Sequence, residues 1–67
     1  MPWIDITIVE GRDMLRKQAM CRAVARAVHE ELGAPLETIR VVVREVAPEL
    51  WCVGDRPKKP VDPSGVA

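Results

Sequence analysis

The sequence predicts an α/β (α+β) domain built from one β-α-β unit, with parallel strands and a short C-terminal hairpin or arm. Three observations predict this fold. Residues 3–9 alternate between apolar and other side chains, residues 14–32 repeat apolar side chains at helical spacing, and residues 39–46 form a second apolar run. Two consecutive strands joined by a crossover helix lie parallel in the same sheet, with a right-handed connection.

The first strand is predicted over residues 3–9 because every second side chain is a branched apolar residue. One face of this strand carries Ile4, Ile6 and Ile8. The other face carries Trp3, Asp5, Thr7 and Val9. Gly11 breaks the alternation, and Asp13 stands where its carboxylate can accept hydrogen bonds from the first amides of the following helix.

The helix is predicted over residues 14–32, with a single apolar stripe that faces a core. The stripe consists of Met20, Cys21, Val24, Ala27, Val28 and Leu32. The polar circumference is supplied mainly by Arg16, Lys17, Arg22, Arg26, Glu30 and Glu31. Gly33 is placed as a C-terminal cap, and Pro35 prevents the helix from continuing.

The second strand is predicted over residues 39–46, with apolar side chains on both faces. Residues 50–55 are predicted to form a short hairpin or arm that turns at Gly54 and Asp55. Residues 57–67 are rich in proline and polar side chains, a composition that predicts a flexible tail without a core. We therefore expect one domain over residues 1–56 and a Pro-rich tail over residues 57–67.

The predicted sheet has one face without cover, because one helix covers only one face of a two-stranded sheet. So small a sheet is not stable alone. A chain of 67 residues also buries only about 60% of the surface that its unfolded form exposes. We therefore expect other subunits to pack on the open face, over Trp3, Val9 and a row of valines, in a closed symmetric oligomer.

The composition narrows the kind of partner. Ten basic and ten acidic residues cancel, so no overall field attracts nucleic acid or an anionic membrane. No apolar run approaches the roughly 20 residues of a membrane span, and the first residues lack the layout of a signal peptide. We therefore expect a cytoplasmic protein with a small-molecule substrate and with neither a nucleic-acid nor a membrane partner.

The cysteines and the histidine argue against a disulfide and against a metal centre. Cys21 and Cys52 lie far apart in the sequence with no second pair, and His29 alone cannot complete a cysteine/histidine metal cage. We expect two free thiols in a reducing compartment and no metal. His29 is expected to be solvated or to cap the helix.

Pro2 is the candidate catalytic residue. If Met1 is removed, which a small second residue favours, the nitrogen of Pro2 becomes a secondary amine that can accept a proton. Apolar surroundings and neighbouring positive charges would favour the neutral form of this amine. The alternative is a proline that only fixes the backbone angle φ at the start of an edge strand.

Arg12, Arg40 and Trp51 are the candidate substrate-binding residues. Arg12 follows the carboxyl end of the first strand, where α/β sheets tend to place ligand groups. The guanidinium groups of Arg12 and Arg40 would hold the carboxylates of an anionic substrate. Alternatively, Arg40 forms a structural ion pair with Glu37 or Glu45. Trp51 would supply an apolar wall or would be a core aromatic residue.

Five short motifs stand at characteristic spacing between Pro2 and Gly54. The motifs are Pro2, Glu10-Gly11-Arg12, Leu32-Gly33-Ala34-Pro35, Ile39-Arg40-Val41, and Trp51 shortly before Gly54. In these motifs the chain resembles the 4-oxalocrotonate tautomerase family. The resemblance implies a homohexamer, built as a trimer of β-α-β dimers, with active sites lined by more than one subunit and with no cofactor.

The resemblance also implies a reaction. Pro2 would be the general base that moves a proton from the 2-hydroxyl group of a dienol such as 2-hydroxymuconate to C5, which gives the conjugated 2-oxo acid. Arg12 would bind the distal carboxylate, Arg40 the 1-carboxylate and the 2-oxo group, and Trp51 would form the hydrophobic wall. The sister reaction, dehalogenation of 3-haloacrylates, is not expected because Val53 stands near the place of a required glutamate.

Two alternatives stay open at this point. The chain could be one subunit of a heterohexamer whose partner chain supplies part of the site. It could also be a non-catalytic subunit that keeps the fold and lends Arg12 or Arg40 to a partner.

Overall fold

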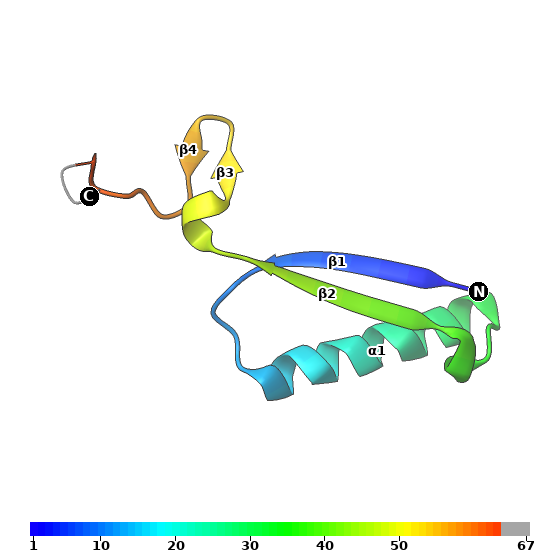
Figure 1. Ribbon diagram of the computed structural model, residues 1–67. Coiled ribbons are helices and arrows are strands. Elements are labelled where there is room, and N and C mark those ends of the chain that lie inside the picture. The colour runs from blue at the N-terminus through cyan, green and yellow to red at the C-terminus, as the bar shows by residue number, and fades with distance from the viewer. Residues whose placement is uncertain (64–67) are drawn as a thin grey trace.

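The computed structural model describes residues 1–63 and contains a single β-α-β unit followed by a short hairpin (Figure 1). Strand β1 (Trp3–Val9) leads into helix α1 (Met14–Leu32), and a 3-10 turn (Leu36–Thr38) precedes strand β2 (Arg40–Val46). The strands are parallel, and α1 lies along one face of the sheet (Figure 1). The predicted fold class is confirmed, and β2 begins one residue later than predicted, at Arg40.

The two strands pair in register from Trp3 opposite Arg40 to Val9 opposite Val46. Because side chains alternate along each strand and Lys17 of α1 bonds to Glu45, the face that carries Glu45 is the face toward the helix. That face also carries Ile4, Ile6, Ile8, Val41 and Val43. The open face carries Trp3, Asp5, Thr7, Val9, Arg40, Val42, Arg44 and Val46. The predicted faces of the first strand therefore agree with the observed register.

Helix α1 begins and ends where its sequence predicts. The side chain of Asp13 accepts a hydrogen bond of 2.8 Å from the backbone N–H of Arg16. At the other end, the backbone N–H of Gly33 donates to the carbonyl oxygen of His29 over 2.9 Å. These two hydrogen bonds satisfy an amide at the first turn and a carbonyl at the last turn of the helix, where backbone groups otherwise lack partners.

The face of α1 that packs on the sheet differs in part from the predicted stripe. Met20, Cys21, Val24 and Val28 are half-buried, as predicted, but Ala27 and Leu32 are exposed. The line of contact runs through positions 17, 21, 24 and 28, so Ala27 lies to its side and Leu32 lies in the last turn. A sheet of two strands is too narrow to cover the whole predicted stripe.

An ion pair connects the first turns of α1 to the end of β2. The Nζ atom of Lys17 lies 2.9 Å from each carboxylate oxygen of Glu45. The exposed fractions of the two side chains are 13% and 32%. The pair therefore lies mostly within the helix–sheet interface and fixes the start of α1 on the sheet.

The segment after β2 forms the predicted arm, which stands away from the sheet (Figure 1). A 3-10 turn (Pro48–Leu50) precedes strands β3 (Cys52–Val53) and β4 (Arg56–Pro57), which pair antiparallel. The chain turns between them at residues 54–55. The short C-terminal hairpin of the predicted fold is therefore present.

Backbone hydrogen bonds hold the chain close to the arm for two residues past β4. The N–H of Lys58 donates to the carbonyl of Trp51 over 2.7 Å, and the N–H of Lys59 donates to the carbonyl of Pro48 over 3.2 Å. The expected boundary between domain and tail falls inside β4, and the division itself stays a prediction. Residues 64–67 of the expected tail lie outside the described residues.

A single chain leaves much apolar surface exposed. Ile39 is the one buried hydrophobic residue of the part of the chain that the structure describes. Trp3 on the open face is 66% exposed, and Leu50 and Val53 on the arm are 78% and 76% exposed. Large exposed apolar surface usually marks an interaction site, so this surface fits the expectation that other subunits cover it.

Candidate active site

Pro2 and Arg40 lie together at the amino-terminal end of the sheet. The backbone N–H of Arg40 donates to the carbonyl oxygen of Pro2 over 3.0 Å, and the next residue, Trp3, pairs with Arg40 in the register. Parallel strands begin at the same edge of a sheet, so the start of β1 and the start of β2 are necessarily neighbours. The candidate base and one candidate carboxylate ligand therefore share one end of the chain's fold.

The side chain of Arg40 has no acidic partner among the described residues. Its Nη1 atom donates to the carbonyl of Glu37 over 2.8 Å and makes a longer contact of 3.5 Å with the carbonyl of Ile39. The carboxylate of Glu45 is bound by Lys17. The structural ion pair that the sequence left open for Arg40 is not formed, and the remaining donors of the guanidinium group are available to an anion.

Arg12 lies at the opposite end of the sheet. Its Nη1 atom donates to the carbonyl of Val9, the last residue of β1, over 3.3 Å. The seven residue steps from Pro2 to Val9 span roughly 23 Å, at about 3.3 Å for each strand residue. Arg12 and Pro2 of one chain therefore cannot hold the same small substrate.

Trp51 belongs to the same end as Arg12. It follows the 3-10 turn after β2, and Val46 at the end of β2 pairs with Val9 (Figure 1). The Trp51 side chain is half-buried, at the base of the hairpin. The four predicted site residues thus form two groups, Pro2 with Arg40 and Arg12 with Trp51, at opposite ends of the sheet.

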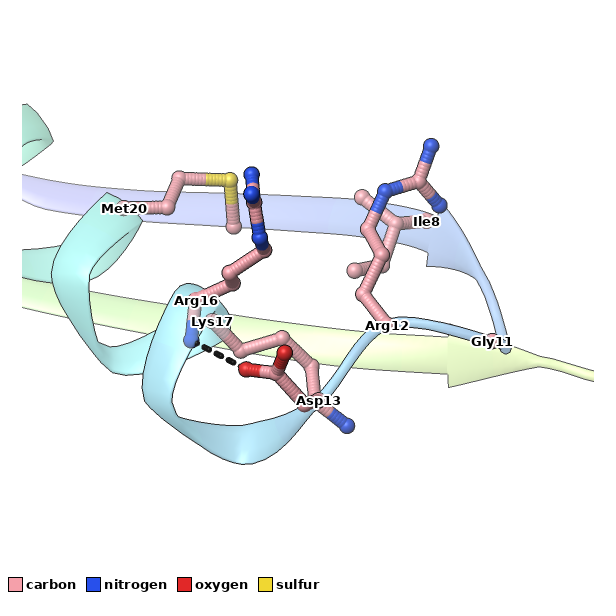
Figure 2. Close-up of a pocket in the computed structure, with 7 residues that line it drawn as sticks. All are labelled: Ile8, Gly11, Arg12, Asp13, Arg16, Lys17 and Met20. Carbon is pink, nitrogen blue, oxygen red and sulfur yellow. Dashed lines mark hydrogen bonds between the residues drawn. The ribbon is translucent and has the colours of Figure 1, made fainter.

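A groove of about 690 Å³ opens beside Arg12, between the end of β1 and the first turns of α1 (Figure 2). Ile8 and Met20 give it an apolar wall, and Arg12 and Arg16 give it two guanidinium groups. Gly11, Asp13 and Lys17 complete the lining. The groove combines an apolar surface with positive charge, which suits a small organic anion.

Sequence reasoning placed Arg16 on the solvated face of the helix and so missed its position in the groove. Its closeness to Arg12 in the sequence is the one available signal, because Arg12 directly precedes the N-cap residue Asp13 and Arg16 lies in the first turn of α1. Whether such a pair lines a groove depends on how the helix packs on the sheet, which the sequence does not state. Gly11 contributes through its backbone, since it takes φ +132°, a conformation that other residues rarely adopt.

The remaining candidate groups take no part in either cluster. Cys21 is half-buried, Cys52 is exposed, and both are free. The Nδ1 atom of His29 lies 2.6 Å from the carbonyl oxygen of Ala34, just past the helix end, in agreement with a capping histidine. The described residues contain no group of three or more His, Cys, Asp or Glu that could hold a metal ion, and no helix long and apolar enough to cross a membrane.

Comparison with known proteins adds to this geometry. The family model described as tautomerase enzyme matches residues 2–60, which include both strands, the helix and the hairpin. The 2-hydroxymuconate tautomerase of Pseudomonas putida is 39% identical over 51 residues, which cover 76% of this chain and 81% of that protein.

Solved structures with this fold include two that are also similar to the chain in sequence. TomN, a 4-oxalocrotonate tautomerase homologue in the tomaymycin biosynthetic pathway, aligns with a TM-score of 0.83 at 44% identity over 85% of this chain and 88% of that one. The heterohexamer 4-oxalocrotonate tautomerase of Chloroflexus aurantiacus aligns with a TM-score of 0.83 at 33% identity over 87% of this chain and 94% of that one.

Proposed function

The chain belongs to the tautomerase family, and on that premise we propose that it is a cofactor-independent tautomerase with Pro2 as general base. Its substrates are 2-hydroxydienoates such as 2-hydroxymuconate, which it converts to the conjugated 2-oxo acid. The likeness to a 2-hydroxymuconate tautomerase supports this substrate class. The single observation that carries the proposal is the hydrogen bond from the N–H of Arg40 to the carbonyl of Pro2, which places the backbone of the base beside that of a carboxylate ligand.

The base forms when Met1 is removed. Met1 is 83% exposed, so the bond that joins it to Pro2 stands at an accessible end of the chain. Cleavage converts the amide nitrogen of Pro2 into a secondary amine with a lone pair. The reaction depends on this step, because an amide nitrogen does not accept protons near neutral pH.

The chemistry is a proton transfer along a conjugated chain. The Pro2 amine takes the proton of the 2-hydroxyl group, the oxygen electrons form the C2 carbonyl, and the C2–C3 double bond moves to C3–C4. The electrons of the C4–C5 double bond then take a proton at C5 from the protonated amine, so no proton is gained or lost overall. Arg40 would bind the 1-carboxylate and stabilise the negative charge that develops on the C2 oxygen.

The other end of the substrate is held by a second chain. Arg12 of that chain would bind the distal carboxylate, and Trp51 would exclude water from the conjugated chain. We therefore propose a homohexamer built as a trimer of dimers. The separation of the two residue groups within one chain and the exposed apolar face support such an assembly.

A second candidate is a partner-dependent subunit of a hetero-oligomer. The heterohexamer tautomerase of Chloroflexus aurantiacus, with the same fold, favours this alternative. In that case a chain of different sequence would supply part of the active site that Pro2, Arg12, Arg40 and Trp51 form in the first candidate. The chain purified alone would then have little activity.

One experiment separates the two candidates. The natively expressed chain is purified alone, its intact mass is compared with the mass expected without Met1, and its subunit number is measured by light scattering. The dienol absorbance of 2-hydroxymuconate is then followed. A processed homo-oligomer that consumes the dienol supports the first candidate, whereas a chain that keeps Met1 has no base and excludes it.

A further inference from the structure

We propose that Arg16 joins Arg12 in a two-arginine subsite for the distal carboxylate of the substrate, and that Arg16 makes the enzyme selective for dicarboxylic over monocarboxylic dienols. This inference rests on the proposed function. It adds a specificity-determining residue on α1 to the groove at the end of β1.

The first support is geometric. The side chains of Arg12 and Arg16 project to the same side of the groove, next to the apolar surface of Ile8 and Met20 (Figure 2). Asp13 and Lys17 project to the other side (Figure 2). A carboxylate at the end of a short carbon chain would find the apolar surface for its methylene or vinyl groups and two guanidinium groups for its oxygens.

The second support is the charge balance in the groove. Lys17 is neutralised by Glu45, whose two carboxylate oxygens it binds at 2.9 Å. The carboxylate of Asp13 is engaged by the backbone N–H of Arg16 at 2.8 Å. Arg12 donates only to a backbone carbonyl, and no carboxylate among the described residues pairs with Arg16. With Asp13 counted against the two arginines, the groove keeps a net positive charge, and neither guanidinium group forms an ion pair among the described residues.

The third support is the position of Arg16 on the helix. The first turn of α1 contains no acidic residue, although acidic residues are favoured at a helix N-terminus and basic residues are disfavoured there. Lys17 avoids this unfavourable interaction through Glu45. Among residues 1–63 no carboxylate forms an ion pair with the Arg16 guanidinium group, and a bound carboxylate would supply one.

The consequence is selectivity between substrates that differ only at the distal end. Both 2-hydroxymuconate and 2-hydroxy-2,4-pentadienoate carry the 1-carboxylate and the 2-hydroxyl group that Pro2 and Arg40 would engage. Only 2-hydroxymuconate carries a distal carboxylate. Loss of Arg16 should therefore weaken the use of the diacid and leave the monoacid unaffected.

The test compares Arg16→Ala with Arg22→Ala, since Arg22 is an exposed arginine of the same helix outside the groove. For Arg16→Ala, kcat/KM for 2-hydroxymuconate should fall about tenfold, through KM, while kcat/KM for 2-hydroxy-2,4-pentadienoate changes less than about twofold. Arg22→Ala should change neither. Light scattering confirms that both variants assemble as the wild type does, and Arg16→Lys, which keeps the charge, should recover part of the loss.

An equal loss for both substrates, or no loss for either, would overturn the inference. If the wild-type chain turns over no dienol, the proposed function fails, and binding then decides the inference separately. Adipate carries a distal carboxylate and hexanoate does not. Calorimetry with these two compounds therefore measures the contribution of that carboxylate to binding, without any reaction. Adipate binding that weakens in Arg16→Ala, with hexanoate binding unchanged, supports the subsite, and unchanged adipate binding overturns it.

Discussion

The backbone N–H of Arg40 donates a hydrogen bond of 3.0 Å to the carbonyl oxygen of Pro2, so the parallel sheet itself joins the candidate base to a candidate carboxylate ligand. The guanidinium group of Arg40 is held in turn by the carbonyl of Glu37, in the 3-10 turn before β2. By contrast, Arg12 follows the other end of β1, and Trp51 lies past the matching end of β2. One chain therefore carries the predicted site residues in two groups, at opposite ends of the sheet.

The first prediction concerns the base. Pro2→Ala, after removal of Met1, should lower kcat for 2-hydroxymuconate by about two orders of magnitude or more, since a positioned general base contributes roughly 10²–10⁴-fold. The carbonyl of residue 2 still accepts the hydrogen bond from Arg40, so the oligomer should form normally. Stopped-flow absorbance measures the rate, and light scattering measures the assembly. A variant with the wild-type rate would show that Pro2 only fixes the start of the strand.

The second prediction concerns the two groups of site residues. The Pro2→Ala and Arg12→Ala variants should each have low activity on their own. Unfolding and refolding an equal mixture of the two should restore part of the wild-type activity. Random pairing places an intact Pro2 beside an intact Arg12 at about a quarter of the sites of a symmetric homo-oligomer. Each variant refolded alone is the control. Mixed oligomers, identified by native mass spectrometry, that remain as inactive as the separate variants would contradict a site shared between chains.

The sequence predicts the strands and the helix well because local patterns determine them. The alternation from Trp3 to Val9 and the caps at Asp13 and Gly33 act within a few residues, and the structure has each of them. The position of Arg16 in a groove and the exposure of Ala27 depend instead on how α1 packs on a narrow sheet. Periodicity along the helix cannot report that packing.

The same distinction applies to the ion pairs. Glu37 and Glu45 are both plausible partners of Arg40 in sequence, yet Glu45 lies on the helix-facing side of the sheet and bonds to Lys17. Arg40 pairs in the register with Trp3 on the opposite face. Alternation along β2 already puts positions 40 and 45 on opposite faces, but which face the helix covers, and so which acidic residue Lys17 binds, depends on how the helix packs.

The third prediction concerns the loop that carries Arg12. Gly11 takes φ +132°, and a Cβ atom there would meet nothing within 4 Å, so Gly11→Ala should act through backbone strain alone, at a cost of about 1–3 kcal/mol. Relief of that strain would move Arg12, and KM for 2-hydroxymuconate should rise several-fold. Gly33→Ala is the matched control, since Gly33 has φ +73° and equally open space at the far end of α1. It should lower the free energy of unfolding without changing KM. An unchanged KM in Gly11→Ala would show that Arg12 is positioned by other contacts.

The fourth prediction concerns the pair between Lys17 and Glu45. Glu45→Ala should lower the free energy of unfolding by about 1–2 kcal/mol, because Lys17 is only 13% exposed and would keep its charge without a partner. Glu49→Ala is the control, since Glu49 and Lys59 form an ion pair with an N–O distance of 3.7 Å and both side chains are more exposed, so the loss of stability should stay below about 0.5 kcal/mol. Denaturant unfolding at one fixed subunit concentration measures both, because the stability of an oligomer depends on that concentration.

The double variant Lys17→Met with Glu45→Leu tests the physical reason for that loss. If the cost comes from an unpaired charge in the helix–sheet interface, removing both charges should recover most of the stability, since apolar side chains of similar size satisfy the same interface. If the double variant is instead as unstable as Glu45→Ala, the loss of the attraction between the two charges accounts for the cost, since that attraction is absent from both variants. That result would contradict a cost that arises from desolvating Lys17.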